Sequence, residues 1–251
     1  MTETGGIEGG FAVVLAAAGS GSRFDPGTGS GRKQFLELGG RPLLFYSLDV
    51  FASLDEVRAI CIVVPGGELE AAGELAASWI GESAHARGDD LALSSVAGGD
   101  SRQESVRLGI EAVGDACEWI LVHDAARPLV DAGDVGALMD AVRKYGAAAL
   151  GYPATDSIKR EADGFCQQGI DRSHVWCVQT PQGASVENFR IAYSRRPEGE
   201  EHTDELGLLE AAGISAKLVE GSRENIKVTL PGDEDLAAFF LSQRQRRGRD
   251  G

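Results

Sequence analysis

The stretch FAVVLAAAGSGSR, residues 11–23, decides the fold class. It begins with seven apolar residues, 11–17, and passes directly into a loop of glycine and serine that ends at Arg23. A continuous apolar run of this length, bounded by glycine, is typical of a buried strand. Because ligands of open parallel sheets bind where strands end, and small residues let backbone amides approach phosphates, this loop is also a candidate anion site.

The same order of elements recurs along most of the chain. Apolar runs predict strands, and helical spacing predicts helices between them. The predicted strands are residues 59–64, 91–97, 119–122 and 147–152, and the predicted helices are residues 43–52, 68–80, 101–113 and 131–145. Ser101 and Glu104 have the S-x-x-E form of a capping box. Alternation of strand and helix with short links predicts an α/β fold with a mostly parallel twisted sheet and helices on both faces.

The alternation of predicted strands and helices stops after residue 152. Residues 154–174 are polar and lack helical periodicity, although they include Phe165 and Ile170, so we expect an excursion or arm. The regular pattern then resumes, with predicted helices at residues 185–195, 203–212 and 232–243 and predicted strands at 216–220 and 226–229. The sequence has no internal repeat and no clear domain boundary, so we expect one domain over residues 1–251.

Composition excludes several classes of protein. The formal net charge is -15, which disfavours binding to nucleic acid, since phosphate backbones are held by clustered cations. No apolar run approaches membrane length, and the first ten residues are acidic and glycine-rich where a signal peptide would be basic and then apolar. The four cysteines are scattered, without a C-x-x-C pair, and are expected to be reduced thiols. These features predict a cytoplasmic protein with no membrane partner.

The loop after the first strand fits neither common phosphate motif. A dinucleotide fingerprint would need glycine where Phe24 stands, and a P-loop would need Gly-Lys-Ser/Thr where Arg32-Lys33-Gln34 stands. What remains is a glycine loop between two cations, Arg23 and Lys33. Such an arrangement suits the charge that develops on a phosphoryl group under attack, although a mobile surface loop would have the same composition.

Polar groups follow two other predicted strands. Residues 98–105, GGDSRQES, run into a helix start, whose free N–H groups can hold anions or base edges. Residues 123–128, HDAARP, offer Asp124 and Arg127 together at the same rim. Further along, Lys227 lies among Ile and Val and needs either solvent or an anionic partner. Each pattern also occurs without a ligand, as a capped helix or a solvated surface charge.

In combination these segments resemble the methylerythritol phosphate cytidylyltransferases of non-mevalonate isoprenoid synthesis. The resemblance extends from Phe11 to about Leu241. The matching stretches are the Ala-Ala-Gly loop with Arg23 and Lys33-Gln34, Gly-Gly-Asp with Arg102 and Ser105, VHDAARP at 122–128, Asp171-Arg172 with Trp176, TPQ at 180–182, TDE at 203–205 and NIKVT at 225–229. The sequence departs from the family pattern at Arg32, where proline is usual, in a longer loop at 25–31, and at Ser157, where threonine is common.

The resemblance implies a Rossmann-like nucleotidyltransferase fold, a homodimer formed through the arm at 154–174, and a reaction of CTP with 2-C-methyl-D-erythritol 4-phosphate. Mg2+ would be held mainly by the CTP phosphates, with no metal ligand from the protein. The implied catalytic residues are Arg23, Lys33, Arg172 and Lys227. The implied nucleotide-binding residues are Ala17, Ala18, Gly19, Gly21, Gly99, Asp100, Arg102 and Ser105. The implied acceptor-binding residues are Asp124, Arg127, Ser157 and Thr180, with Ser157 and Arg172 coming from the other subunit.

Two alternatives share this fold. A ribitol 5-phosphate cytidylyltransferase would differ mainly in the acceptor pocket, and the arm motif at 156–160 with Asp171-Arg172 favours the methylerythritol acceptor. A nucleotide-binding dimer without chemistry is the other alternative, because fold does not prove activity. The cations implied for catalysis are all present in the sequence, which favours an enzyme.

Overall fold

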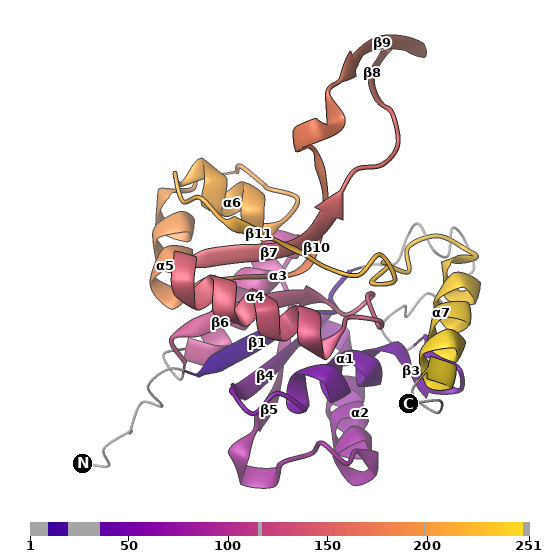
Figure 1. Ribbon diagram of the computed structural model, residues 1–251. Helices are drawn as coiled ribbons and strands as arrows, with labels where there is room; N and C mark the ends of the chain where they lie inside the picture. Colours follow the sequence, from indigo (N-terminus) through magenta and orange to yellow (C-terminus); the bar gives the residue numbers. More distant parts are fainter. Residues whose placement is uncertain (1–9, 20–35, 115–116, 198, 248–251) are drawn as a thin grey trace.

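A twisted sheet with helices on both sides forms the centre of the protein (Figure 1). The computed structural model describes residues 10–19, 36–114, 117–197 and 199–247. In that part of the chain the large sheet has seven strands in the order β11-β7-β10-β6-β1-β4-β5. Their bounds are β1 (Phe11–Ala16), β4 (Val57–Val64), β5 (Ala92–Ala97), β6 (Trp119–Asp124), β7 (Ala147–Pro153), β10 (Trp176–Ser185) and β11 (Lys217–Glu220).

The sheet is mostly parallel, as predicted, with one strand reversed. β1 runs parallel to β4 and β6, so that Leu15 lies opposite Ile62 on one side and His123 on the other. β10 runs antiparallel between β6 and β7. The strand at residues 176–185 is not evident from the sequence, because the Thr-Pro-Gln-Gly run within it interrupts both the apolar pattern and its alternation.

The helices divide between the two faces of the sheet. Alternate residues of β1 point to opposite faces, Val13 toward one hydrophobic cluster and Val14 toward the other. The first face is covered by α1 (Leu43–Ala52), α2 (Leu69–Glu82) and α4 (Ala132–Tyr145), and the second by α3 (Arg102–Val113), α5 (Val186–Arg195) and α6 (Glu205–Ala211). Ser101 caps α3 by accepting a hydrogen bond from the Glu104 amide at 3.2 Å, whereas the Glu104 carboxylate pairs with Arg107.

A smaller unit packs beside the sheet. It consists of the short pair β2 (Glu37–Leu38) and β3 (Arg41–Pro42) with the last helix, α7 (Asp233–Arg247), joined by an apolar cluster that includes Leu38, Val228 and Ala237.

The strand predicted at 226–229 is wrong. That segment has no ladder. The Val228 amide donates to the Ala126 carbonyl oxygen at 2.9 Å, and side chains bond the Thr229 amide, through Asp233, and the Lys227 carbonyl oxygen, through the Thr229 hydroxyl.

The predicted arm is present as a hairpin that projects away from the sheet (Figure 1). It consists of β8 (Ile158–Ala162) and β9 (Phe165–Ile170), paired antiparallel and inserted between β7 and β10. All of β9 is exposed, and Phe165 is 72% exposed. Short 3-10 turns complete the described elements at Gly66–Glu68, Gly88–Asp90 and Arg172–His174.

None of the described helices is both long enough and apolar enough to cross a lipid bilayer. The four cysteines are free thiols, of which Cys61 and Cys117 are buried and Cys166 and Cys177 are exposed. Burial raises the pKa of the Cys61 and Cys117 thiols, so these two side chains behave as small apolar groups of the core.

Close packing of α3 on the sheet depends on a glycine inside the helix. A Cβ atom at Gly109 would lie 2.5 Å from Cγ1 of Val14 and 2.7 Å from Cγ2 of Val63. Both distances are shorter than van der Waals contact. The helix therefore lies nearer to β1 and β4 than any residue with a side chain would allow.

We expect Gly109→Ala to lower the free energy of unfolding by about 1–2 kcal/mol, because overpacking costs more than the helix propensity that alanine returns. Urea unfolding followed by circular dichroism measures this. Gly136→Ala in α4 is the matched control, since nothing lies within 4 Å of the added Cβ there. Gly136→Ala should keep or raise the free energy of unfolding. An equal increase in Gly109→Ala would contradict the prediction, because it would show that α3 can move away from the sheet without loss of stability.

Candidate active site

Two loops meet at the carboxyl edge of the sheet, one after β1 and one after β5. A Cβ atom at Gly98 would lie 2.7 Å from the Ala18 Cβ and 2.6 Å from the Ser105 Oγ, so only glycine permits this approach. The buried Ser105 hydroxyl accepts a hydrogen bond from the Gly99 amide at 3.1 Å and donates to the Ser101 carbonyl oxygen at 2.8 Å. The start of α3 is thereby fixed against the loop after β1.

The predicted nucleotide-binding residues within the described chain gather here, apart from Arg102. Ala17 is buried and Ala18 half-buried, whereas Gly19, Gly99 and Asp100 are exposed at the rim. Exposed main-chain groups at a helix start can hold an anion or a base edge. The other three predicted residues of this loop, Gly21, Arg23 and Lys33, lie outside the described residues.

Asp124, the last residue of β6, lies at the centre of a cluster of cations. Its Oδ2 is 2.7 Å from the Lys227 Nζ, its Oδ1 is 3.1 Å from the Arg102 Nη2, and the Arg127 Nε is 3.9 Å away. Burial alone would raise the pKa of this carboxyl, but Arg102 and Lys227 outweigh burial and hold the pKa well below its usual range. Asp124 is therefore ionised throughout the physiological range.

Arg102 joins this cluster to α6. Its Nη1 and Nη2 lie 2.8 and 3.0 Å from the two carboxylate oxygens of Glu205, whose side chain is 2% exposed. Burial raises the pKa of the Glu205 carboxyl, and Arg102 offsets part of that effect. All three guanidinium nitrogens of Arg102 donate to Asp124 or Glu205. Its predicted contact with the nucleotide remains a prediction.

A chain of hydrogen bonds runs through a buried histidine beneath Asp124. The Asp124 amide donates to the Thr180 Oγ1 at 3.0 Å, and that oxygen lies 3.2 Å from the His123 Nδ1. The His123 Nε2 is 3.1 Å from the Arg127 carbonyl oxygen, which can only accept, so Nε2 carries the proton and Nδ1 accepts from the threonine hydroxyl. Burial lowers the pKa of His123 to about 4, and the ring is neutral at pH 7.

A bulge in β10 brings Thr180 to this position. The pairing of β10 with β7 skips from Val178 opposite Gly151 to Gln182 opposite Ala149, so residues 179–181 face only one residue of the partner strand. Bulges of this kind redirect side chains. Here the bulge directs Thr180 toward β6 and Gln179 toward the carbonyl oxygens of Ser222 and Asn225.

The two predicted residues of the arm lie apart from this cluster. Ser157 and Arg172 are exposed, and the Arg172 guanidinium donates to the Thr155 carbonyl oxygen at the base of the hairpin. Within the described chain neither residue forms a hydrogen bond or ion pair with Asp124 or its partners. The structure thus brings Asp124, Arg127, Thr180 and Lys227 together and leaves Ser157 and Arg172 on the arm.

Residues 11–243 match the family model described as IspD: 2-C-methyl-D-erythritol 4-phosphate cytidylyltransferase. The chain belongs to this family. It is 39% identical over 243 residues to the 2-C-methyl-D-erythritol 4-phosphate cytidylyltransferase of Acidobacterium capsulatum, covering 94% of this chain and 98% of that protein. It is 37% identical over 238 residues to the enzyme of the same description from Pelotomaculum thermopropionicum, covering 94% and 96%.

A solved structure agrees with this membership. The crystal structure of 2-C-methyl-D-erythritol 4-phosphate cytidylyltransferase from Thermus thermophilus superposes with a TM-score of 0.72 at 30% identity, covering 92% of this chain and 98% of that one. The predicted family and the predicted α/β nucleotidyltransferase fold are confirmed. The chain is accordingly a nucleotidyltransferase.

Sequence reasoning gave no role to three buried polar residues of the site: Gln179, Glu205 and Asn225. They are between 0 and 3% exposed. Each lies inside or beside a segment that carried the family resemblance, but their partners come from distant parts of the chain. The sequence shows each of them only as a polar residue within an apolar or turn-rich segment. That pattern does not indicate which distant residue will be its hydrogen-bond partner.

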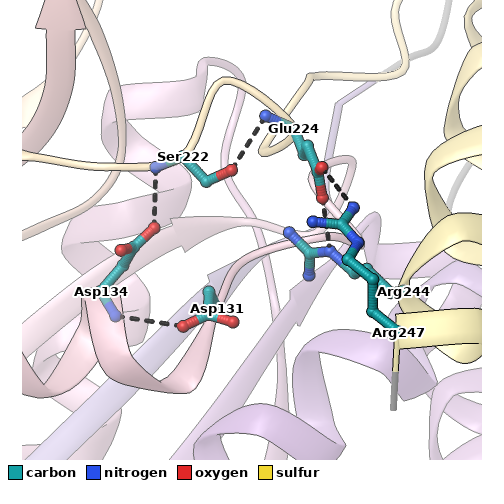
Figure 2. Close-up of a pocket in the computed structure, with 6 residues that line it drawn as sticks. All are labelled: Asp131, Asp134, Ser222, Glu224, Arg244 and Arg247. Carbon is teal, nitrogen blue, oxygen red and sulfur yellow. Dashed lines mark hydrogen bonds and ion pairs between the residues drawn. The ribbon is translucent and has the colours of Figure 1, made fainter. Parts of the chain in front are cut away.

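A cavity of about 330 Å³ opens beside the segment that carries Lys227. Figure 2 shows its lining, with Asp131 and Asp134 from the start of α4, Ser222 and Glu224, and Arg244 and Arg247 from α7. Both arginines pair with Glu224, at 2.9 and 2.6 Å, and Asp134 accepts from the Ser222 amide at 2.8 Å. Each charged side chain of the lining thus has a partner, since Asp131 accepts from the Gly133 amide at 2.8 Å, and none of the predicted site residues lines the cavity.

The buried histidine predicts a pH dependence of stability. Because His123 has a pKa of about 4 when folded and about 6.5 when unfolded, the unfolded state takes up the proton first as pH falls. Stability should therefore decline between about pH 6.5 and 4, by up to about 3 kcal/mol from this group. Urea unfolding across that range should show a shallower decline in His123→Asn. The exposed His85 is the control, since His85→Asn should keep the wild-type slope, and equal slopes in all three proteins would contradict the assignment.

Proposed function

We propose that this chain transfers the cytidylyl group of CTP to 2-C-methyl-D-erythritol 4-phosphate, yielding 4-diphosphocytidyl-2-C-methyl-D-erythritol and pyrophosphate in isoprenoid precursor biosynthesis. The observation that carries this proposal is the family match over residues 11–243. The relatives named above bear this activity in their descriptions. The site also has two distinct parts along the sheet edge: the loops after β1 and β5, which expose main-chain groups, and the cluster of cations around Asp124.

The acceptor phosphate is assigned to the Asp124 side. Within the described cluster, Arg102, Arg127 and Lys227 bring three positive charges against two carboxylates, Asp124 and Glu205. The cluster thus keeps a local positive excess in a chain whose formal charge is -15. Lys227 remains 36% exposed, and the buried Arg127 Nε has no hydrogen-bond partner among the described residues. Lys227 is therefore placed to bind an anion, and Arg127 adds positive charge to the cluster.

The nucleotide is assigned to the loops after β1 and β5. Ala17, Ala18, Gly19, Gly99, Asp100 and Ser105 would hold the cytidine, and Arg23 and Lys33 would lie at the α-phosphate. A phosphate oxygen of the acceptor attacks the α-phosphorus in line, the bond to the β-phosphate oxygen breaks, and pyrophosphate leaves. Lys227 and Arg172 orient the nucleophile while Arg23 and Lys33 stabilise the added negative charge, so no covalent intermediate is needed.

A magnesium ion fits this arrangement only as a partner of the substrate. The described residues contain no group of three or more His, Cys, Asp or Glu side chains placed to hold a metal, and the Asp124 carboxylate already faces cations. Mg2+ commonly binds substrate phosphates while keeping several waters. We therefore assign it to the CTP phosphates, where it would offset their charge when bound.

A second copy of the chain completes the site in our proposal. Ser157 and Arg172 lie on a projecting hairpin and have no contact with the Asp124 cluster of their own described chain. Phe165 and Ile170 on the same hairpin are 72% and 37% exposed, an apolar surface that another subunit would cover. We also assign the enzyme to the cytoplasm, where free thiols stay reduced.

The reaction is tested by pyrophosphate release from CTP and magnesium with methylerythritol phosphate, ribitol phosphate or no acceptor. Release with methylerythritol phosphate alone is the expected result. Release with ribitol phosphate alone would keep the chemistry but reassign the acceptor. Binding of CTP without release would support the non-catalytic alternative.

Mixing two inactive variants tests the contribution of the second subunit. If Arg172 acts in the partner's site, Arg172→Ala and Lys227→Ala should each be weak alone, whereas a co-refolded mixture should recover about a quarter of wild-type activity, from random pairing in which half the dimers hold one intact site. Two copies of Arg172→Ala refolded together are the control. No recovery in the mixture would place Arg172 in its own subunit's site or outside the mechanism.

A further inference from the structure

Lys227 reaches Asp124 from a segment that has no regular structure. Residues 221–229 form neither helix nor strand, yet the Lys227 Nζ is held 2.7 Å from the Asp124 Oδ2. A long side chain on a mobile backbone would lose much conformational entropy in making this contact. The backbone beside Lys227 must therefore be fixed by interactions other than a sheet ladder.

Asn225 supplies those interactions from two residues away. Its side chain is fully buried, and its Nδ2 donates to the Thr180 carbonyl oxygen at 2.9 Å. Its own carbonyl oxygen accepts from the Arg127 Nη1 at 2.8 Å and from the Gln179 Nε2 at 3.2 Å. One residue is thus bonded to the β10 bulge and to the loop after β6.

We propose that Asn225 is a positioning residue for the acceptor. It fixes the segment that carries Lys227 relative to Thr180 and Arg127, because its side chain bonds the Thr180 carbonyl oxygen and its own carbonyl oxygen accepts from the Arg127 guanidinium. This inference rests on the proposed function, because the acceptor is what these three side chains are assigned to hold. Asn225 acts through its neighbours and does not itself contact substrate.

The arrangement predicts an effect on one substrate only. Among the described residues, the hydrogen bonds of Asn225 go to Arg127, Thr180, Gln179 and the Ser222 carbonyl oxygen, and none goes to the loops after β1 and β5. Loosening the segment should displace the Lys227 ammonium while leaving the nucleotide loops in place. A general loss of stability would instead weaken both substrates together.

The test compares two positions that make the same kind of hydrogen bond. Asn188 on α5 donates from Nδ2 to the Gly146 carbonyl oxygen, also at 2.9 Å, but forms no hydrogen bond with the site residues that the structure describes. The variants are Asn225→Ala and Asn225→Asp, with Asn188→Ala and Asn188→Asp as controls. Asn225→Asp keeps the shape of the side chain and replaces the donor with an acceptor facing a carbonyl oxygen, so it remains informative if the alanine variant fails to fold.

We expect both Asn225 variants to raise KM for methylerythritol phosphate about 10- to 100-fold, with KM for CTP changed less than about twofold. The Asn188 variants should lose thermal stability to a similar extent with both KM values near wild type. Equal effects on both substrates, or equal effects at both positions, would overturn the proposal.

Crystal structures of wild type and Asn225→Asp provide a readout that does not depend on turnover. The distance from the Lys227 Nζ to the Asp124 Oδ2 should lengthen beyond hydrogen-bond range in the variant, and an unchanged distance would also overturn the proposal. If the wild-type protein releases no pyrophosphate with methylerythritol phosphate, the proposed function fails, and this distance alone decides whether Asn225 positions Lys227.

Discussion

The buried carboxylate of Asp124 is the constraint on which the active-site edge depends. An ionised group removed from water is costly unless charges and hydrogen bonds compensate it. At the end of β6 that compensation comes from α3 through Arg102 and from the segment after β11 through Lys227, while Thr180 of the β10 bulge accepts a hydrogen bond from the Asp124 main-chain amide. Elements far apart in the sequence are therefore held around one point of the sheet, where the reaction is assigned.

The ion pairs around Asp124 also explain why a strongly acidic protein can accept two polyanionic substrates. Surface carboxylates are largely screened beyond about 10 Å in ordinary salt, whereas partly buried charges are screened much less. Arg102 is shared between Asp124 and Glu205, which leaves Lys227 and Arg127 with charge to offer an incoming phosphate. The formal charge of the whole chain is therefore a poor guide to the potential at the site.

Much of the fold could be predicted from sequence because its signals are local. α1 begins and ends at the predicted residues, and β1, β4, β5, β6 and β7 lie within a few residues of the predicted runs, since apolar periodicity and caps are encoded where the element forms. Two predictions failed for the opposite reason: β10 was not predicted, and the strand predicted at residues 226–229 is absent. Bulges, turns and side-chain bonds from Gln179 and Arg127 decide their structure, and those partners are more than 40 residues away.

The sequence indicated which segments form the site, but not how their side chains contact one another. The structure brings together four of the residues that the resemblance assigned to the acceptor, Asp124, Arg127, Thr180 and Lys227, and leaves Ser157 and Arg172 apart. No pattern in the sequence indicated that Glu205 would bind Arg102 or that His123 would be buried and neutral. These are consequences of packing. They follow once β6, β10 and α6 are placed side by side, and no run of neighbouring residues encodes them.

The hairpin between β7 and β10 has a closed base, because Trp176 pairs with Pro153 and the Ala154 amide donates to the Val175 carbonyl oxygen at 2.9 Å. Changes of length or sequence beyond that base leave the register of the sheet untouched. The hairpin can therefore change without altering the edge built around Asp124. If Ser157 and Arg172 reach the partner's acceptor as proposed, preference for one sugar-alcohol phosphate over another can evolve in this appendage without a new nucleotide site.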